Sequence, residues 1–176
     1  MHNTFILGAA LLISTSVTLG IDSRARAAGE PAWNDALQAV DNAIATGDAG
    51  EAQRAFLRAY AAAIGSRRWE AMLAVGDAAR RVADVNGARA SGIQWARRCY
   101  LSALFRARDA RALDGVVDAV ERFAQLGDRD TVTQGLRMAD AMARQRADAS
   151  GLTRVRALAE RFGEHPMVSG DLRAEP

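Results

Sequence analysis

The chain has 176 residues, of which 49% are hydrophobic and 6% are aromatic, and its formal net charge is +2. This length suits one domain with a core of its own, and the nearly balanced charge gives no indication of a nucleic-acid-binding protein. All 23 basic residues are Arg, and Ala is very common. With so few aromatic residues, we expect a core made of close contacts between helices.

Residues 1–28 have the features of a bacterial export signal. The stretch from Phe5 to Leu19 is mostly apolar, and Ala25-Arg26-Ala27 has the small-x-small pattern of a cleavage site. We place cleavage after Ala27 or Ala28, and we expect a periplasmic or secreted protein. An uncut anchor is the alternative, because no Lys or Arg precedes the apolar stretch. No later stretch is apolar enough to cross a membrane, so we expect no stable insertion after cleavage.

Three glycines divide the remaining chain at equal intervals: Gly47, Gly87 and Gly127. Each lies between two stretches of helical periodicity, and a period of about 40 residues is typical of stacked arrays. Small or apolar residues recur on the same interval and predict a shared packing seam: Ala52, Gly92 and Val132; Ala59, Cys99 and Ala139; Ala63, Ala103 and Ala143. Chance is the alternative, since an Ala-rich chain aligns with itself at many offsets.

In chain order, the periodicity predicts three helical hairpins and a short final helix. Pro31 suits a first turn, and the first helix runs to about Thr46. The second begins with a capping-box-like pair, Asp48 and Glu51. Gly65-Ser66 closes this hairpin, and Ser66 is the candidate N-cap for the next helix.

The second hairpin begins at about Arg67 and turns at Asn86-Gly87, and its second helix spans roughly residues 89–106. The third turns at Leu126-Gly127-Asp128. Ser150-Gly151 then breaks the chain before a capping helix that ends at Gly163. We expect no strands, and we expect a flexible tail over residues 164–176.

One helix carries a family resemblance. At Ala52-x3-Phe56-x2-Ala59, the chain resembles the second helix of a tetratricopeptide repeat, in which small residues let neighbouring helices approach closely. The other two hairpins match more loosely, the Pro that ends such a repeat is missing, and the 40-residue period exceeds the family's 34. The resemblance implies an all-α, right-handed array of antiparallel hairpins over residues 29–163, and a protein-binding role.

Catalysis is not expected from this sequence. Two histidines are present, of which His2 leaves with the signal and His165 lies in the tail. Nucleophilic catalysis needs a base within reach, and a zinc site needs several His or Cys ligands. We therefore predict no catalytic residue, no metal site and no cofactor. The single Cys99 lies on an apolar stripe, where a packed and inert thiol is expected.

Arginine is the remaining candidate for binding. Two interpretations compete, of which the first is a solvated face in which Arg stems cover apolar neighbours. The second is a groove that holds a carboxylate-bearing partner, with Trp33, Trp69 or Trp95 as candidate neighbours. The candidate partner-binding residues are Arg67, Arg68, Arg97, Arg98, Arg106 and Arg108.

The leading hypothesis is a non-catalytic, exported helical-repeat protein that binds another protein or a peptide. Its concave surface would come from the first helix of each hairpin. A small-molecule-binding bundle and a self-associating structural protein are the alternatives. The sequence leaves open the partner, the oligomeric state, and the choice between an open array and a closed bundle.

Overall fold

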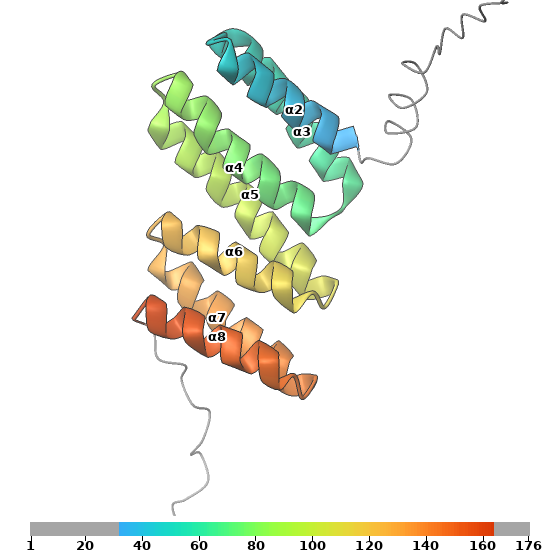
Figure 1. Cartoon of the computed structure of the whole chain (residues 1–176), viewed down its shortest axis with the longest axis vertical. Coiled ribbons are helices and arrows are strands. Elements are labelled where there is room, and N and C mark those ends of the chain that lie inside the picture. Colours follow the sequence, from blue (N-terminus) through green and yellow to red (C-terminus); the bar gives the residue numbers. More distant parts are fainter. Residues whose placement is uncertain (1–31, 164–176) are drawn as a thin grey trace, which may run out of the picture. The chain divides into compact units, whose positions relative to one another are not determined.

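A computed structural model describes residues 32–163, and over these residues the chain is all-helical, without strands (Figure 1). The all-α prediction is therefore confirmed. The expected signal, Pro31 and the expected tail lie outside the described residues. The helices are α2 (Ala32–Ala45), α3 (Ala49–Ser66), α4 (Trp69–Val85), α5 (Arg89–Asp109), α6 (Leu113–Gln125), α7 (Arg129–Gln145) and α8 (Ala149–Arg161).

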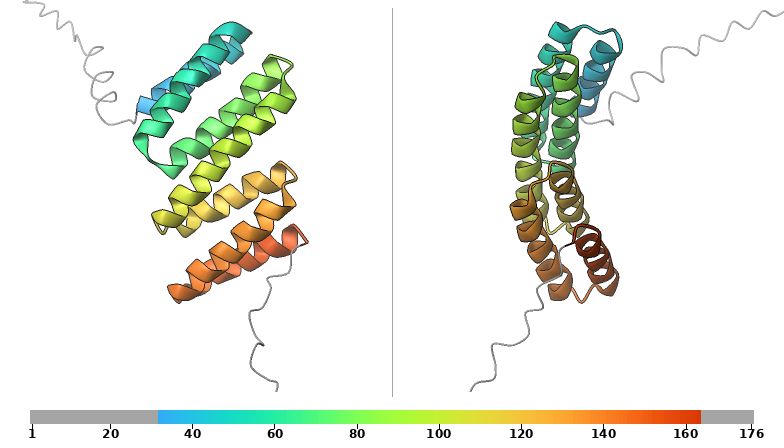
Figure 2. Two further views of the ribbon diagram at one scale, coloured as in Figure 1. Left: turned by 180° about the vertical axis from the view of Figure 1, so that it is seen from behind. Right: turned by 90° about the vertical axis from the view of Figure 1, so that its left-hand side faces the viewer.

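The helices of this region form two layers. Each helix packs against the next in the chain, and α2 also touches α4, α4 touches α6, and α6 touches α8. We call α2, α4, α6 and α8 the even layer, and α3, α5 and α7 the odd layer; Figure 2 shows the two layers edge-on. None of the helices within residues 32–163 combines the length and the apolar character needed to cross a membrane.

The core between the layers is built from the predicted seam. Every residue of the three seam rows is buried, and the rows that begin at Ala59 and Ala63 are completely shielded from solvent. Tyr100, Phe56 and Phe123 are the largest side chains that are fully buried in this part of the chain. The sequence pattern therefore identified the contact face of the helices correctly.

Glycine lets α4 and α5 approach each other closely. A Cβ at Gly76 would overlap the ring of Tyr100 and would lie 3.2 Å from the Cβ of Cys99. On the facing helix, a Cβ at Gly92 would overlap that of Ala83. Gly92 belongs to the predicted seam, so this backbone contact is itself part of the sequence pattern.

Five of the six helix connections between α2 and α8 share one turn. In each, the second residue after the helix has a positive φ, and the next residue donates its N–H to the carbonyl five residues earlier, at 2.8–3.1 Å. Hydrogen bonds of this kind close a helix end in the Schellman motif. The positive-φ residues in these five turns are Gly47, Gly87, Arg111, Gly127 and Ala147. The turns at the glycines were predicted, and those at Arg111 and Ala147 were missed.

Two predicted boundaries are wrong. Gly65 and Ser66 belong to α3, and Ser66 does not cap α4; its hydroxyl donates to the carbonyl of Ala63 and accepts from the N–H of Arg68. Ser150 and Gly151 lie in the first turn of α8, because the break falls earlier, at residues 146–148. Both boundaries were predicted from glycine, but in these two turns Arg67 and Ala147 adopt the left-handed conformation.

Aspartate starts three of the helices. The carboxylates of Asp48, Asp128 and Asp148 each accept the N–H three residues on, at 2.8, 3.3 and 2.8 Å. The cap at Asp48 was predicted. The capping box at Asp48 forms only by half, because the Glu51 side chain binds Arg54 and Arg58 instead of the Asp48 N–H.

Candidate functional site

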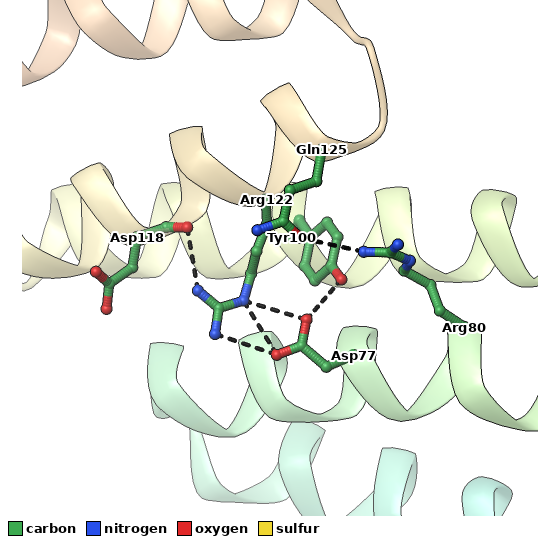
Figure 3. Close-up of polar contacts among 6 residues, drawn as sticks. All are labelled: Asp77, Arg80, Tyr100, Asp118, Arg122 and Gln125. Carbon is green, nitrogen blue, oxygen red and sulfur yellow. Dashed lines mark hydrogen bonds and ion pairs between the residues drawn. The ribbon is translucent and has the colours of Figure 1, made fainter. Parts of the chain in front are cut away.

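A connected polar cluster joins α4, α5 and α6 around Asp77 (Figure 3). The Tyr100 hydroxyl donates to Asp77 Oδ1 at 2.7 Å, and Arg122 Nε lies 3.1 Å from Oδ2. Arg122 also donates through Nη1 to the carbonyl of Asp118 at 3.2 Å. The guanidinium is thereby held in one orientation against the carboxylate.

The chemistry of this cluster favours a structural role. Burial and the bond to Asp77 raise the pKa of Tyr100 well above its ordinary value, so the phenol stays protonated and donates. Burial likewise raises the pKa of Asp118. Both carboxylate oxygens of Asp77 already accept hydrogen bonds, which leaves it poorly placed to take a proton from a substrate. The cluster ties the second hairpin to α6.

A shallow hollow of about 410 Å³ opens beside this cluster, on the even layer. Most of the charged side chains that line it already have a hydrogen-bond or ion-pair partner within the chain. Arg81 binds Asp41 at 2.8 Å, Asp84 pairs with Arg89 at 3.3 Å, and Arg80 donates to Gln125 at 3.2 Å. The lining residues are Asp77, Arg80, Arg81, Asp84, Arg122 and Gln125.

Further ion pairs run along the even layer on the 40-residue interval. Asp41 pairs with Arg81, and Glu121 pairs with Arg161, each at 2.8 Å. Asp114 and Arg154, which are separated by the same interval, meet at 2.6 Å. None of these pairs was predicted. The signal was present, because residues 41, 81, 121 and 161 occupy one register and alternate in sign.

The two layers differ in charge. The helices of the odd layer carry ten Arg and four acidic residues. Those of the even layer carry six Arg and nine acidic residues. The small net charge of the chain is therefore the sum of a basic odd layer and an acidic even layer. Helix α5 alone has five Arg and one Asp.

Exposed apolar side chains also gather on the odd layer. Leu57 and Ile64 project from α3, and Ile93, Leu101 and Phe105 project from α5, each between 39% and 47% exposed. On the even layer, the comparably exposed Val85 and Phe162 lie at or just beyond a helix end. A row at steps of four, Ile93, Arg97, Leu101 and Phe105, runs along α5 and places apolar and cationic groups together.

The six candidate arginines fall into two groups. Three meet where α3 ends: Arg67 takes a φ of 57° there, and Arg68 binds Glu70 at 2.9 Å. Arg106 donates to the carbonyls of Ala63 and Arg68 at 3.0 and 3.2 Å. This connection lacks the shared turn, and Arg106 supplies the donors that the turn would otherwise provide.

The other three candidates lie along the exposed side of α5. Arg97 pairs with Asp128 at 2.8 Å, and the guanidinium of Arg98 lies 5.8 Å from the centroid of Trp95. Arg108 binds Asp109 at 2.8 Å and lies 5.0 Å from the centroid of Phe105. Partner binding by any of the six stays a prediction.

The three tryptophans are partly buried against the core. Trp95 makes edge-on contacts with Phe56 and Tyr60, at centroid distances of 5.6 and 5.2 Å. The Trp95 ring therefore packs α5 against α3, and the guanidinium of Arg98 lies near the same ring. Packing within the chain accounts for the position of this ring.

Cys99 is buried, as predicted. Burial raises its pKa from the ordinary 9.0 to about 12, so the thiolate is scarce at neutral pH. Residues 32–163 contain no group of three His, Cys, Asp or Glu side chains placed to hold a metal ion.

Comparison of the chain with protein-family models, with curated proteins and with solved structures found no match. No family membership is therefore shown. The chain's own residues, above all the opposite charges of the two layers, are therefore the guide to its function.

Proposed function

We propose that this chain is an exported, non-catalytic, tetratricopeptide-like repeat protein of the cell envelope that binds an acidic protein or peptide. The observation that carries the proposal is the odd layer, where exposed apolar side chains lie among an excess of Arg. Aromatic side chains, here Phe105, and Arg are both enriched in protein interfaces.

The odd layer is a better candidate than the even layer. Ion pairs within the chain occur on both layers, but the odd layer has the excess of Arg and five exposed apolar side chains along its helices. The sequence pattern suggested a concave surface of first helices, which is the even layer. The proposal instead assigns binding to the second helices, because Leu101, Phe105 and Arg98 are exposed there.

Self-association through α5 is disfavoured by charge. Two copies of this helix would bring ten Arg against two Asp, and like charges at an interface oppose binding. With an acidic partner, the charges across the interface would be opposite and would favour binding. The apolar side chains between the arginines favour protein over nucleic acid, because a phosphate backbone offers them no apolar contact.

Capture from envelope extract tests the proposal. The bait is the chain from Gly29 onward, and the extract is treated with nuclease so that nucleic acid cannot bridge two proteins. The bait should enrich a partner, and a Leu101→Ser, Phe105→Ser double variant should reduce that enrichment at least fivefold. Arg98→Glu should weaken capture similarly, because it reverses the charge of the face.

Two matched variants serve as controls. Val85→Ser removes an apolar side chain of similar exposure from the even layer, and Arg156→Glu reverses an exposed charge on α8. Both should retain capture. The proposal is overturned if no protein is enriched, or if these controls lose the partner as completely as the odd-layer variants.

A further inference from the structure

A surface pocket of about 580 Å³ lies between the end of α5 and the second half of α7, within the odd layer. Its volume falls in the range of ligand pockets. Its walls combine three guanidinium groups with two thioethers, and no acidic side chain lines it. The lining residues are Arg108, Arg111, Met138, Ala141, Met142, Gln145 and Arg146.

The arginines of this pocket retain capacity for an anion. Arg146 donates through Nη1 to the carbonyl of Arg111 at 2.9 Å, which fixes its position. Its charge acts on the nearby Asp148 but makes no direct ion pair among residues 32–163. The Arg111 side chain makes no hydrogen bond or ion pair within the same range. Arg108 binds Asp109, an exposed neighbour outside the pocket lining. A carboxylate can accept two N–H bonds from one guanidinium, so it complements this set.

The apolar part of the pocket is adaptable. Met138 and Met142 lie one helical turn apart on α7, are partly buried, and pack against the core. Methionine adjusts to partners of different shape because its unbranched side chain is flexible. Arg108, which lines the pocket, also stacks on Phe105, so the apolar row of α5 leads to it.

We infer that this pocket is an anchoring site for a partner segment in which an Asp or Glu lies next to a large apolar side chain. The carboxylate binds Arg111 and Arg146, and the apolar side chain covers Met138 and Met142. The inference rests on the proposed function, for which it names the chemistry of the bound segment. The occupant is a protein segment, because the pocket continues an exposed helix face.

Methyl NMR on the chain from Gly29 onward tests the site directly. The probe is the blocked peptide acetyl-Glu-Leu-Leu-Glu-amide, titrated into protein labelled at its methionine methyls. Met138 and Met142 report on the pocket, and the buried Met72 on α4 is the internal control. We expect saturable shifts at the first two and none at Met72.

Two further peptides separate the two requirements. Acetyl-Gln-Leu-Leu-Gln-amide lacks the charges, and acetyl-Glu-Gly-Gly-Glu-amide lacks the apolar side chains; each should bind at least fivefold more weakly. Arg111→Gln should weaken the first peptide at least fivefold. Arg137→Gln, at an exposed arginine of α7 outside the pocket, should leave its affinity within twofold.

The site is overturned if the uncharged peptide binds as well, if Arg111→Gln has no effect, or if the three methionines shift alike or not at all. Calorimetric binding that the Leu101→Ser, Phe105→Ser variant loses, without shifts at Met138 and Met142, overturns the pocket but supports the broader odd-layer face. Capture from extract decides the proposed function independently of this titration.

Discussion

Asp41 and Arg81 occupy the same place in successive 40-residue units, and their side chains lie 2.8 Å apart across α2 and α4. Glu121 and Arg161 repeat this relationship across α6 and α8. The interval that places glycines in the turns thus also places opposite charges on facing helices. These pairs are roughly half exposed, whereas the pair between Asp77 and Arg122 is more deeply buried and has Tyr100 as a third partner.

The two kinds of ion pair should therefore differ in their contribution to stability. Asp77→Asn leaves a partly buried guanidinium without its counter-ion and should lower the free energy of unfolding by about 1–3 kcal/mol. Asp41→Asn should change it by about 0.5 kcal/mol or less, because water and salt screen an exposed pair. Urea denaturation of the two variants makes the comparison, and equal losses would contradict the structural role of the Asp77 cluster.

Replacing Gly76 and Gly65 with Ala should change the stability of the fold in opposite directions. Gly76→Ala places a methyl group against the buried Tyr100 ring and should destabilise the fold by about 1–3 kcal/mol, the usual effect of overpacking. Gly65→Ala fills open space on α3 and should stabilise it by about 0.5–1 kcal/mol through helix propensity. Thermal unfolding of both variants gives the signs. A neutral Gly76→Ala would show that the α4–α5 contact is looser than described.

A turn without glycine offers a stabilising substitution. Ala147 has a φ of 52°, in the left-handed region that a Cβ disfavours by about 1–2 kcal/mol. Ala147→Gly should therefore stabilise the fold by about 0.5–1 kcal/mol, since the added flexibility of the unfolded chain offsets part of the gain. Gly127→Ala, at a φ of 73° in the same turn type, should destabilise it. Differential scanning calorimetry decides whether the two changes have opposite signs.

The thiol of Cys99 should be nearly unreactive in the folded protein. With a pKa of about 12, it is ionised to roughly one part in ten thousand at pH 8, and it is also buried. Reaction with a disulfide reagent should follow unfolding, and denatured protein should react at once. Rapid labelling of the native chain would contradict the burial of this residue.

The same group gives a pH dependence of stability. Because folding raises the pKa of Cys99, the folded state holds a proton that the unfolded state releases above pH 9.0. This contribution is fully present below pH 9.0 and is lost as the pH rises toward 12, at up to about 1.4 kcal/mol per pH unit. Unfolding titrations of the wild type and Cys99→Ala measure it, and the variant should lose less stability over this range.

The sequence was sufficient for the helices and for most of their contacts. Helical periodicity located every helix of residues 32–163, and matching small residues such as Ala59, Cys99 and Ala139 identified the buried face, because each describes a repeating local geometry. Turns at Arg111 and Ala147 could not be found in this way, since nothing in their residue type favours a positive φ. There the shared hydrogen bonds from the following residue hold the strained conformation in place.

The candidate site was harder to predict. The role of Arg106 depends on three carbonyl groups near residues 63–68, which only the packed hairpins bring within reach. The Arg111 pocket likewise depends on side chains from the end of α5, from the connection after it and from α7 coming together. The charge difference between the layers, in contrast, could be read from the sequence by counting charges helix by helix.

That difference limits how such a chain could lengthen. The shared turn joins helices within hairpins and between them, so turn geometry alone would tolerate the gain or loss of a single helix. An odd number of inserted helices, however, would move every later helix to the opposite side and mix basic with acidic surfaces. Duplication within such a chain can therefore preserve its two-sided character only in steps of two helices.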